Sequence, residues 1–133
     1  MLASKKPIPH FRHLVSIPFI SILIVPLVFL DVMTEIYHRI CFPLYRIPCV
    51  KRREHIKIDR HKLKYLNWFE KVGCAYCGYG NGLLHYISEI AARTEKYWCG
   101  IKHAKDPNFR PPEHHKDFLE YGDKEGLDNF LER

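Results

Sequence analysis

Residues 14–30 read LVSIPFISILIVPLVFL and include no charged side chain. A straight helix of this length would measure about 25 Å, slightly less than the roughly 30 Å hydrocarbon core of a bilayer. Pro18 and Pro26 each lack a main-chain N–H and therefore favour a bend. A chain of 133 residues is too short to bury such a segment on all sides. The sequence therefore predicts a membrane-embedded helix, either spanning or bent and re-entrant. Because the run continues directly into Asp31 without a small-residue cleavage site, we expect the anchor to be retained.

The distribution of charge divides the chain. Residues 1–103 contain 16 Lys and Arg against 7 Asp and Glu, whereas residues 104–133 contain 5 against 8. We expect a mostly α fold in three parts: a membrane anchor with an interfacial segment at 1–50, a small helical cysteine/histidine domain at 51–104, and an acidic tail with a short helix at 105–133. So short a chain provides one modest soluble core, which excludes a two-domain enzyme.

The segment after the apolar run has the composition of a membrane surface contact. Residues 36–45 mix apolar, aromatic and basic side chains, and Pro43 and Pro48 are expected to stop any long helix there. The following cationic run predicts a contact with anionic membrane lipids worth about 1 kcal/mol per charge, or else a solvated loop; it consists of Lys51, Arg52 and Arg53. Nucleic acid is not an expected partner, because the basic residues adjoin the apolar segment instead of covering an independent domain.

Several short elements are predicted in the next part of the chain. Residues 54–59 alternate between apolar and polar side chains, which indicates a short strand. From residue 60, apolar residues recur every three positions up to residue 72, so we expect a helix that ends at Gly73. Residues 74–82 read CAYCGYGNG, and their three glycines predict a tight loop.

A second helix is predicted to start with Asn81 as its N-cap and to reach Trp98. Glu89 and Arg93 are spaced to form an i, i+4 ion pair on it, and Gly100 is placed to end it. In the tail, Pro112 and Gly122 bracket a further short helix at 113–121.

The predicted loop and the end of the second helix carry two short pairs of metal-ligand residues. Cys74-x2-Cys77 is followed after 21 residues by Cys99-x3-His103. Three thiolates and one imidazole match the ligands of a tetrahedral zinc site, provided that the glycine-rich loop folds back along the helix. His85, His55 and His61 are alternative fourth ligands. A CxxC redox pair, an iron or iron–sulfur site, and unligated thiols are the other interpretations.

The sequence thus favours a binding protein. It contains no pattern typical of a Ser/His/Asp triad, a phosphate-binding loop or a paired-carboxylate site, so no enzyme activity is assigned. The leading hypothesis is a membrane-anchored, zinc-type metal-binding accessory module that docks onto a membrane protein or complex. The alternative is an electron-transfer or thiol-redox accessory protein that uses the same cysteines.

A series of short motifs carries a resemblance over residues 31–104. They are DRH at 59–61, YLN at 65–67, CAYC at 74–77, NG at 81–82, EIAARTE at 89–95 and YWCGIKH at 97–103. In these motifs the chain resembles a group of small uncharacterised bacterial membrane-associated proteins, in which Pro is expected at the position of Gly100. The resemblance implies a bacterial membrane setting and no particular activity. With the cationic run and the cysteines, it predicts the inner membrane, with the soluble part on the cytoplasmic face.

Overall fold

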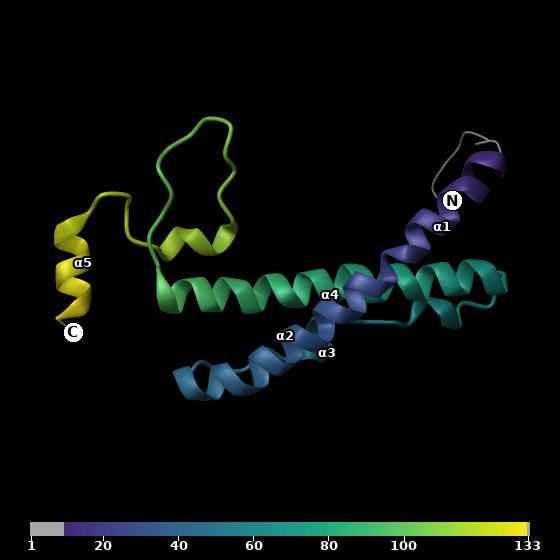
Figure 1. The fold of residues 1–133 in the computed structure, drawn as a ribbon, viewed down its shortest axis with the longest axis horizontal. Helices are drawn as coiled ribbons and strands as arrows, with labels where there is room; N and C mark the ends of the chain where they lie inside the picture. The colour runs from purple at the N-terminus through teal and green to yellow at the C-terminus, as the bar shows by residue number, and fades with distance from the viewer. Residues whose placement is uncertain (1–9, 133) are drawn as a thin grey trace. The chain divides into compact units, whose positions relative to one another are not determined.

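A computed structural model describes residues 10–132 of the chain, and the described residues are mostly helical (Figure 1). The elements are α1 (His10–Ile22), α2 (Ile24–Tyr45), α3 (Arg52–His55), α4 (Trp68–Trp98) and α5 (Lys124–Leu131), with the 3-10 helices η1 (Arg60–Lys62) and η2 (Glu113–Asp117). The predicted fold class, mostly α with an apolar N-terminal helix, is confirmed.

The chain forms two compact units, Met1–Ile87 and Ser88–Arg133, which are described separately below as unit 1 and unit 2. The domain boundaries predicted at residues 50 and 104 stay predictions. The first nine residues of the predicted anchor lie outside the described part of the chain.

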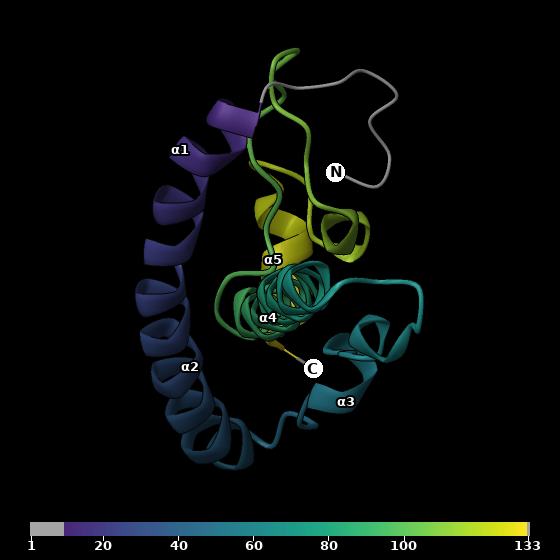
Figure 2. The ribbon, with the colours of Figure 1, turned by 90° about the vertical axis from the view of Figure 1, so that its right-hand side faces the viewer.

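In unit 1, α1 and α2 form one curved stretch of helix that is interrupted only at Leu23 (Figure 2). Pro26 supplies no N–H to the carbonyl of Ile22, so the regular i, i+4 pattern fails at this point. At the interruption, the Leu23 N–H donates to the Ile20 carbonyl at 3.3 Å, three residues back, and the hydroxyl of Tyr76 donates to the same carbonyl at 2.7 Å. The interruption expected from the proline is therefore supported by a side chain of α4.

The helix α2 continues through Pro43 to Tyr45, and Arg46 ends it with a left-handed φ of 57°. The prediction that residues 36–45 form no long helix is therefore wrong. Leu14–Tyr45 is long and apolar enough to cross a membrane, and much of its surface is exposed and apolar. We call this surface the apolar face; it comprises Leu14, Val15, Phe19, Ile20, Ile22, Leu23, Val25, Val28, Phe29, Leu30, Val32, Met33, Ile36, Ile40 and Leu44.

The segment between α2 and α4, residues 46–67, runs back beside α4, and we call it the return segment. Its predicted strand at 54–59 is not formed: the single turn α3 ends at His55, and the next four residues have no regular structure. This segment lies so close to α4 that a Cβ atom on Gly82 would be 2.8 Å from the carbonyl oxygen of His55. A Cβ atom on Gly78 would be 3.2 Å from the carbonyl oxygen of Lys57. The glycines thus make room for a neighbouring main chain.

This packing explains why α4 is one helix of 31 residues through the stretch predicted as a loop. Each glycine inside a helix costs about 1 kcal/mol relative to alanine. Here the close approach of the 55–58 segment on one side, and of the Leu27 side chain to Gly80 on another, offsets that cost. The predicted helix end at Gly73 is wrong, and so is the predicted N-cap, because the Asn81 amide donates to the Cys77 carbonyl in mid-helix.

Unit 2 begins in the last turns of α4. The predicted ion pair there is confirmed, with 2.9 Å between Arg93 Nε and Glu89 Oε1, and Gly100 follows the helix with a left-handed φ of 60°. The chain then loops out and returns to form a single parallel bridge, Ile101 to Leu119. The helix predicted at 113–121 is shorter than expected, because only η2 forms before that bridge.

Candidate functional site

Unit 2 gathers three metal-ligand side chains from three separate segments. Glu95 lies in the last turn of α4, His103 in the loop that follows, and His115 in η2 (Figure 1). One ligand atom from each of these residues lies within 4.8 Å of the others. We call these three residues the Glu–His cluster.

Glu95 is the centre of the Glu–His cluster. Its Oε2 is 2.8 Å from His114 Nε2, and each of its carboxylate oxygens is 3.2 Å from His115 Nε2. The hydrogen bond from His114, and then that from His115, lower the pKa of Glu95 below its ordinary value despite some desolvation. The carboxylate is therefore ionised at neutral pH, as a metal ligand must be.

His115 is the buried member, with 3% of its surface exposed. Its ring stacks on Phe118 with a centroid distance of 4.8 Å, which fixes its orientation. Its Nδ1 is buried and has no hydrogen-bond partner among the described residues. The described residues contain a second such atom, Nδ1 of His61 in η1, so this feature alone marks no metal site, and the nitrogen of His115 that faces Glu95 is Nε2.

His103 is the exposed member of the cluster and lies on the loop that follows α4. Its ring packs edge-to-face on Phe109 at 5.1 Å and lines, with His115, an open cavity of about 620 Å³. Metal–nitrogen bonds of about 2.0 Å place neighbouring ligand atoms roughly 3.3 Å apart in a tetrahedral site. Glu95 and His115 already have that spacing, so only the exposed His103 side chain has to move closer.

The predicted ligand set is distributed differently. Cys74 and Cys77 lie within α4 in unit 1, whereas Cys99 and His103 follow the end of α4 in unit 2. The loop on which a shared four-ligand site depended is helix instead, and the 21 residues from Gly78 to Trp98 make about 32 Å of helix. All five cysteines are free thiols. The four-ligand site stays a prediction, and its only member in the Glu–His cluster is His103.

The alternative fourth ligands lie elsewhere. His55 and His85 face each other in unit 1 with ring centroids 5.4 Å apart, and His61 lies in η1. His114 and His115 lie in the stretch 113–121 that was predicted as a tail helix, and the His115 ring is buried against Phe118. No local pattern links these histidines to Glu95, since 19 and 20 residues separate them.

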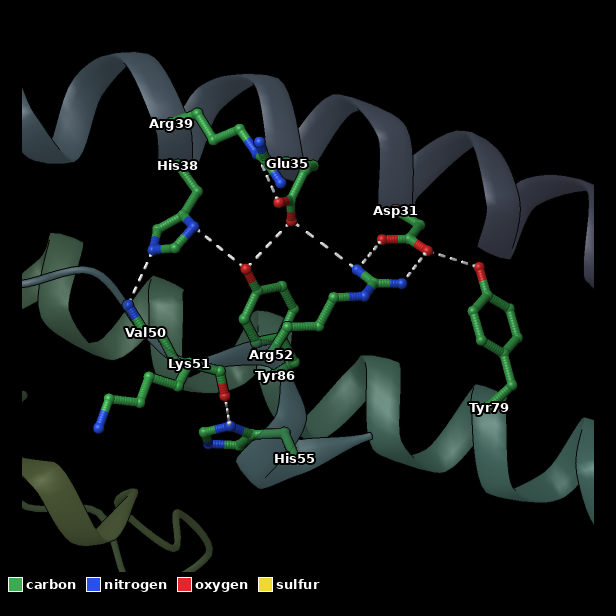
Figure 3. Close-up of polar contacts among 10 residues, drawn as sticks. All are labelled: Asp31, Glu35, His38, Arg39, Val50, Lys51, Arg52, His55, Tyr79 and Tyr86. Carbon is green, nitrogen blue, oxygen red and sulfur yellow. Dashed lines mark hydrogen bonds and ion pairs between the residues drawn. The ribbon is translucent and has the colours of Figure 1, made fainter. Parts of the chain in front are cut away.

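Unit 1 contains a second cluster of polar side chains, on the side of α2 that faces α4 (Figure 3). We call it the polar network; it comprises Asp31, Glu35, His38, Arg39, Arg52, Tyr79, Tyr86 and the main-chain N–H of Val50. Arg52 makes a two-pronged ion pair with Asp31, with distances of 2.5 and 2.6 Å from its two terminal nitrogens to the carboxylate oxygens. The Tyr79 hydroxyl donates to the same carboxylate at 2.7 Å. Two helices and the return segment are thus joined at one aspartate.

The polar network continues one turn further along α2. Glu35 accepts hydrogen bonds from Arg39 at 2.7 Å and from the Tyr86 hydroxyl at 3.1 Å. His38 Nε2 accepts from the main-chain N–H of Val50 at 2.9 Å, so the ring proton of neutral His38 is on Nδ1, which lies 3.1 Å from the Tyr86 oxygen. Donors and acceptors therefore match along the chain of bonds from Val50 to Glu35.

These bonds make Arg52 a member of the polar network. Its side chain is 38% exposed and points at Asp31, while Lys51 is 80% exposed and Arg53 is exposed. The hydrogen bond with Asp31 raises the pKa of Arg52. Burial, and then the carboxylate partners, raise the pKa of Tyr79 and of Tyr86 to about 12, so both hydroxyls remain donors at neutral pH. The predicted contact of Lys51, Arg52 and Arg53 with membrane lipids stays a prediction.

Comparison with known proteins adds no assignment. No family model, no curated protein and no solved structure matches the chain. The geometry of the Glu–His cluster and of the polar network is therefore the basis on which a function is argued.

Proposed function

We propose that this protein is a membrane-anchored module that binds one divalent metal ion, of the zinc type, through Glu95, His103 and His115. The observation that carries the proposal is the convergence of three ligand atoms, from three segments of unit 2, to within 4.8 Å of one another. His115 is held in place by Phe118, and the ionised carboxylate of Glu95 supplies negative charge.

The donor set supports zinc. Two imidazoles and one carboxylate form a common three-ligand zinc site that leaves a fourth position for water or another group. The same set also suits iron(II), so metal analysis has to distinguish the two. A bound ion would tie the end of α4, the following loop and η2 together, and so strengthen a unit with a small core.

Anchoring is supported by the Leu14–Tyr45 stretch, whose length and hydropathy suffice for a membrane and whose apolar face is exposed. We place the soluble part on the cytoplasmic face of a bacterial inner membrane, where thiols stay reduced. Docking onto a membrane protein or complex is the accessory role that we propose for the module.

The thiol-redox alternative rests on Cys74 and Cys77, which are three residues apart on α4, half-buried and exposed respectively, and free. It stays a prediction. Its readout differs from that of the metal site, because Cys74→Ser would remove a dithiol and leave the Glu–His cluster intact.

The test is zinc binding by the full chain purified in detergent. After treatment with a chelator, zinc is returned in competition with a chromogenic chelator, and iron is assayed in parallel. We expect about one equivalent of zinc, and His115→Ala should weaken binding by more than about 100-fold, since even outer-shell partners contribute 10- to 100-fold.

Two further variants separate the competing ligand sets. Cys99→Ser removes a ligand of the predicted four-ligand site and should leave zinc affinity unchanged. His85→Ala removes an exposed histidine of unit 1 and serves as the matched control. Loss of zinc in Cys99→Ser with retention in His115→Ala would reject the Glu–His cluster and restore the cysteine site.

A further inference from the structure

We propose that α1 and α2 lie in the plane of the membrane, with the apolar face inserted into one leaflet, and do not cross the bilayer. This inference rests on the membrane anchoring in the proposed function and is independent of the metal site. The occupant of the apolar face is then lipid.

The two sides of the helical stretch differ in chemistry. The exposed side of the stretch carries the apolar face, all of whose residues are uncharged. The opposite side carries Asp31, Glu35 and His38, spaced four and three residues apart, and all of them bond to groups of unit 1 outside α2 (Figure 3). From Asp31 onward, α2 therefore has a polar side and an apolar side, as a helix that lies in the interface does, whereas residues 14–30 are uncharged throughout.

The ion pair between Asp31 and Arg52 fixes the depth of the return segment. Asp31 directly follows the uncharged run 14–30, and Arg52 lies within 2.5 Å of it. If the run crossed the bilayer, Arg52 would lie at one edge of the hydrocarbon, and the return segment beyond it would continue inward beside α4 with Lys57 and Asp59. A charge near the middle of the bilayer costs about 2.5 to 3.5 kcal/mol.

The polar side extends toward the start of the stretch. Beyond Arg52 the return segment passes Gly82 and then Gly78 of α4. Nearer its start, α4 bonds through Tyr76 to Ile20 of α1. The return segment carries the charged residues Lys57 and Asp59, which pair with each other at 3.3 Å and remain largely exposed. A spanning arrangement would bring this side of unit 1 into hydrocarbon, where exposed irregular main chain does not occur.

An in-plane arrangement places the apolar face in lipid and leaves the charged residues of unit 1 at the membrane surface. The apolar face enters the acyl region to a depth of about 5 to 10 Å, and the polar network and the return segment stay at the headgroup level. Lys51 and Arg53 are then available to anionic headgroups, each with an attraction of about 1 kcal/mol. The interruption at Leu23 and the curvature of α1 and α2 in Figure 2 suit a helix that follows a surface.

The two topologies differ in where the chain ends lie. The full chain is expressed with an uncharged tag at the N-terminus and a second tag at the C-terminus, and protease is added to intact spheroplasts and to inverted vesicles. In-plane insertion predicts that both tags are cleaved from the same side, the cytoplasmic one. Crossing predicts cleavage of one tag from each side, and this result would overturn the proposal.

Membrane sedimentation in the same samples separates this inference from the proposed function. Recovery of the chain in the soluble fraction without detergent would overturn anchoring and in-plane insertion together, whereas zinc content would report on the metal site alone. Tags on opposite sides with the chain still membrane-bound would mean that another protein or a second copy shields the polar side within the bilayer.

Discussion

The polar network of unit 1 and the Glu–His cluster of unit 2 use the same kinds of side chain and leave them in different states. In the polar network, Asp31 and Glu35 each meet an arginine and a tyrosine, and both ring nitrogens of His38 have partners. In the Glu–His cluster, the Glu95 carboxylate faces the Nε2 atoms of His114 and His115, and the buried Nδ1 of His115 has no hydrogen-bond partner among residues 10–132. Hydrogen-bonding groups that all have partners stabilise the fold, whereas a carboxylate surrounded by imidazoles offers ligand atoms to a metal ion.

The largest expected difference between the Glu–His cluster and the polar network is in the effect of zinc on stability. At a free concentration 100 times the dissociation constant, zinc should stabilise the folded protein by about 2.7 kcal/mol. His115→Ala should abolish this gain, while Arg52→Ala should lower the starting stability and keep the gain. Thermal unfolding in detergent with and without zinc measures both, and an equal response of the two variants would contradict the division of roles.

The next largest expected effect is the loss of stability when the polar network is broken. Arg52→Ala leaves Asp31, which is 15% exposed, without its main partner. We expect a loss of about 1 to 3 kcal/mol, between the values for exposed and for buried ion pairs. Lys116→Ala breaks the exposed pair with Glu113 in unit 2 and should cause no measurable change. Chemical denaturation compares the two, and similar values would show that the polar network is no stronger than a surface pair.

The polar network also depends on the close approach of the return segment to α4. Gly82→Ala places a methyl group 2.8 Å from the His55 carbonyl oxygen and should destabilise unit 1 by about 1 to 3 kcal/mol. Gly73→Ala lies on the same helix with nothing within 4 Å, so it should stabilise by about 0.5 to 1 kcal/mol through helix propensity. Stabilisation by both substitutions would show that the segment does not pack there.

The smallest effect is confined to high pH. Because the pKa of Tyr79 and of Tyr86 is raised to about 12 from an ordinary value near 10, their stabilising contribution is complete below pH 10 and is lost as the pH rises through 12. Ultraviolet titration should therefore show late-ionising tyrosines. Tyr79→Phe and Tyr86→Phe should each remove one late component, and no change in that component in either variant would contradict this prediction.

The sequence was informative where local spacing decides the outcome. The apolar stretch, the mostly helical class, the pairing of Glu89 with Arg93 and the end of α4 near Gly100 all follow from patterns within a few residues. The glycine-rich stretch at 74–82 shows where such patterns mislead. Glycines predict a loop when considered alone, but here they allow another segment to pack against a helix.

What the sequence by itself determined is therefore the helical, apolar character of the N-terminal stretch and the supply of metal-ligand side chains. Only the tertiary structure decided which of them meet: Arg52 with Asp31, and Glu95 with His103 and His115. The physical reason is range. Hydrophobic periodicity and i, i+4 pairing act within a turn or two of helix, whereas the ion pair between Arg52 and Asp31 joins residues 21 positions apart, which only the packing of the chain can bring together.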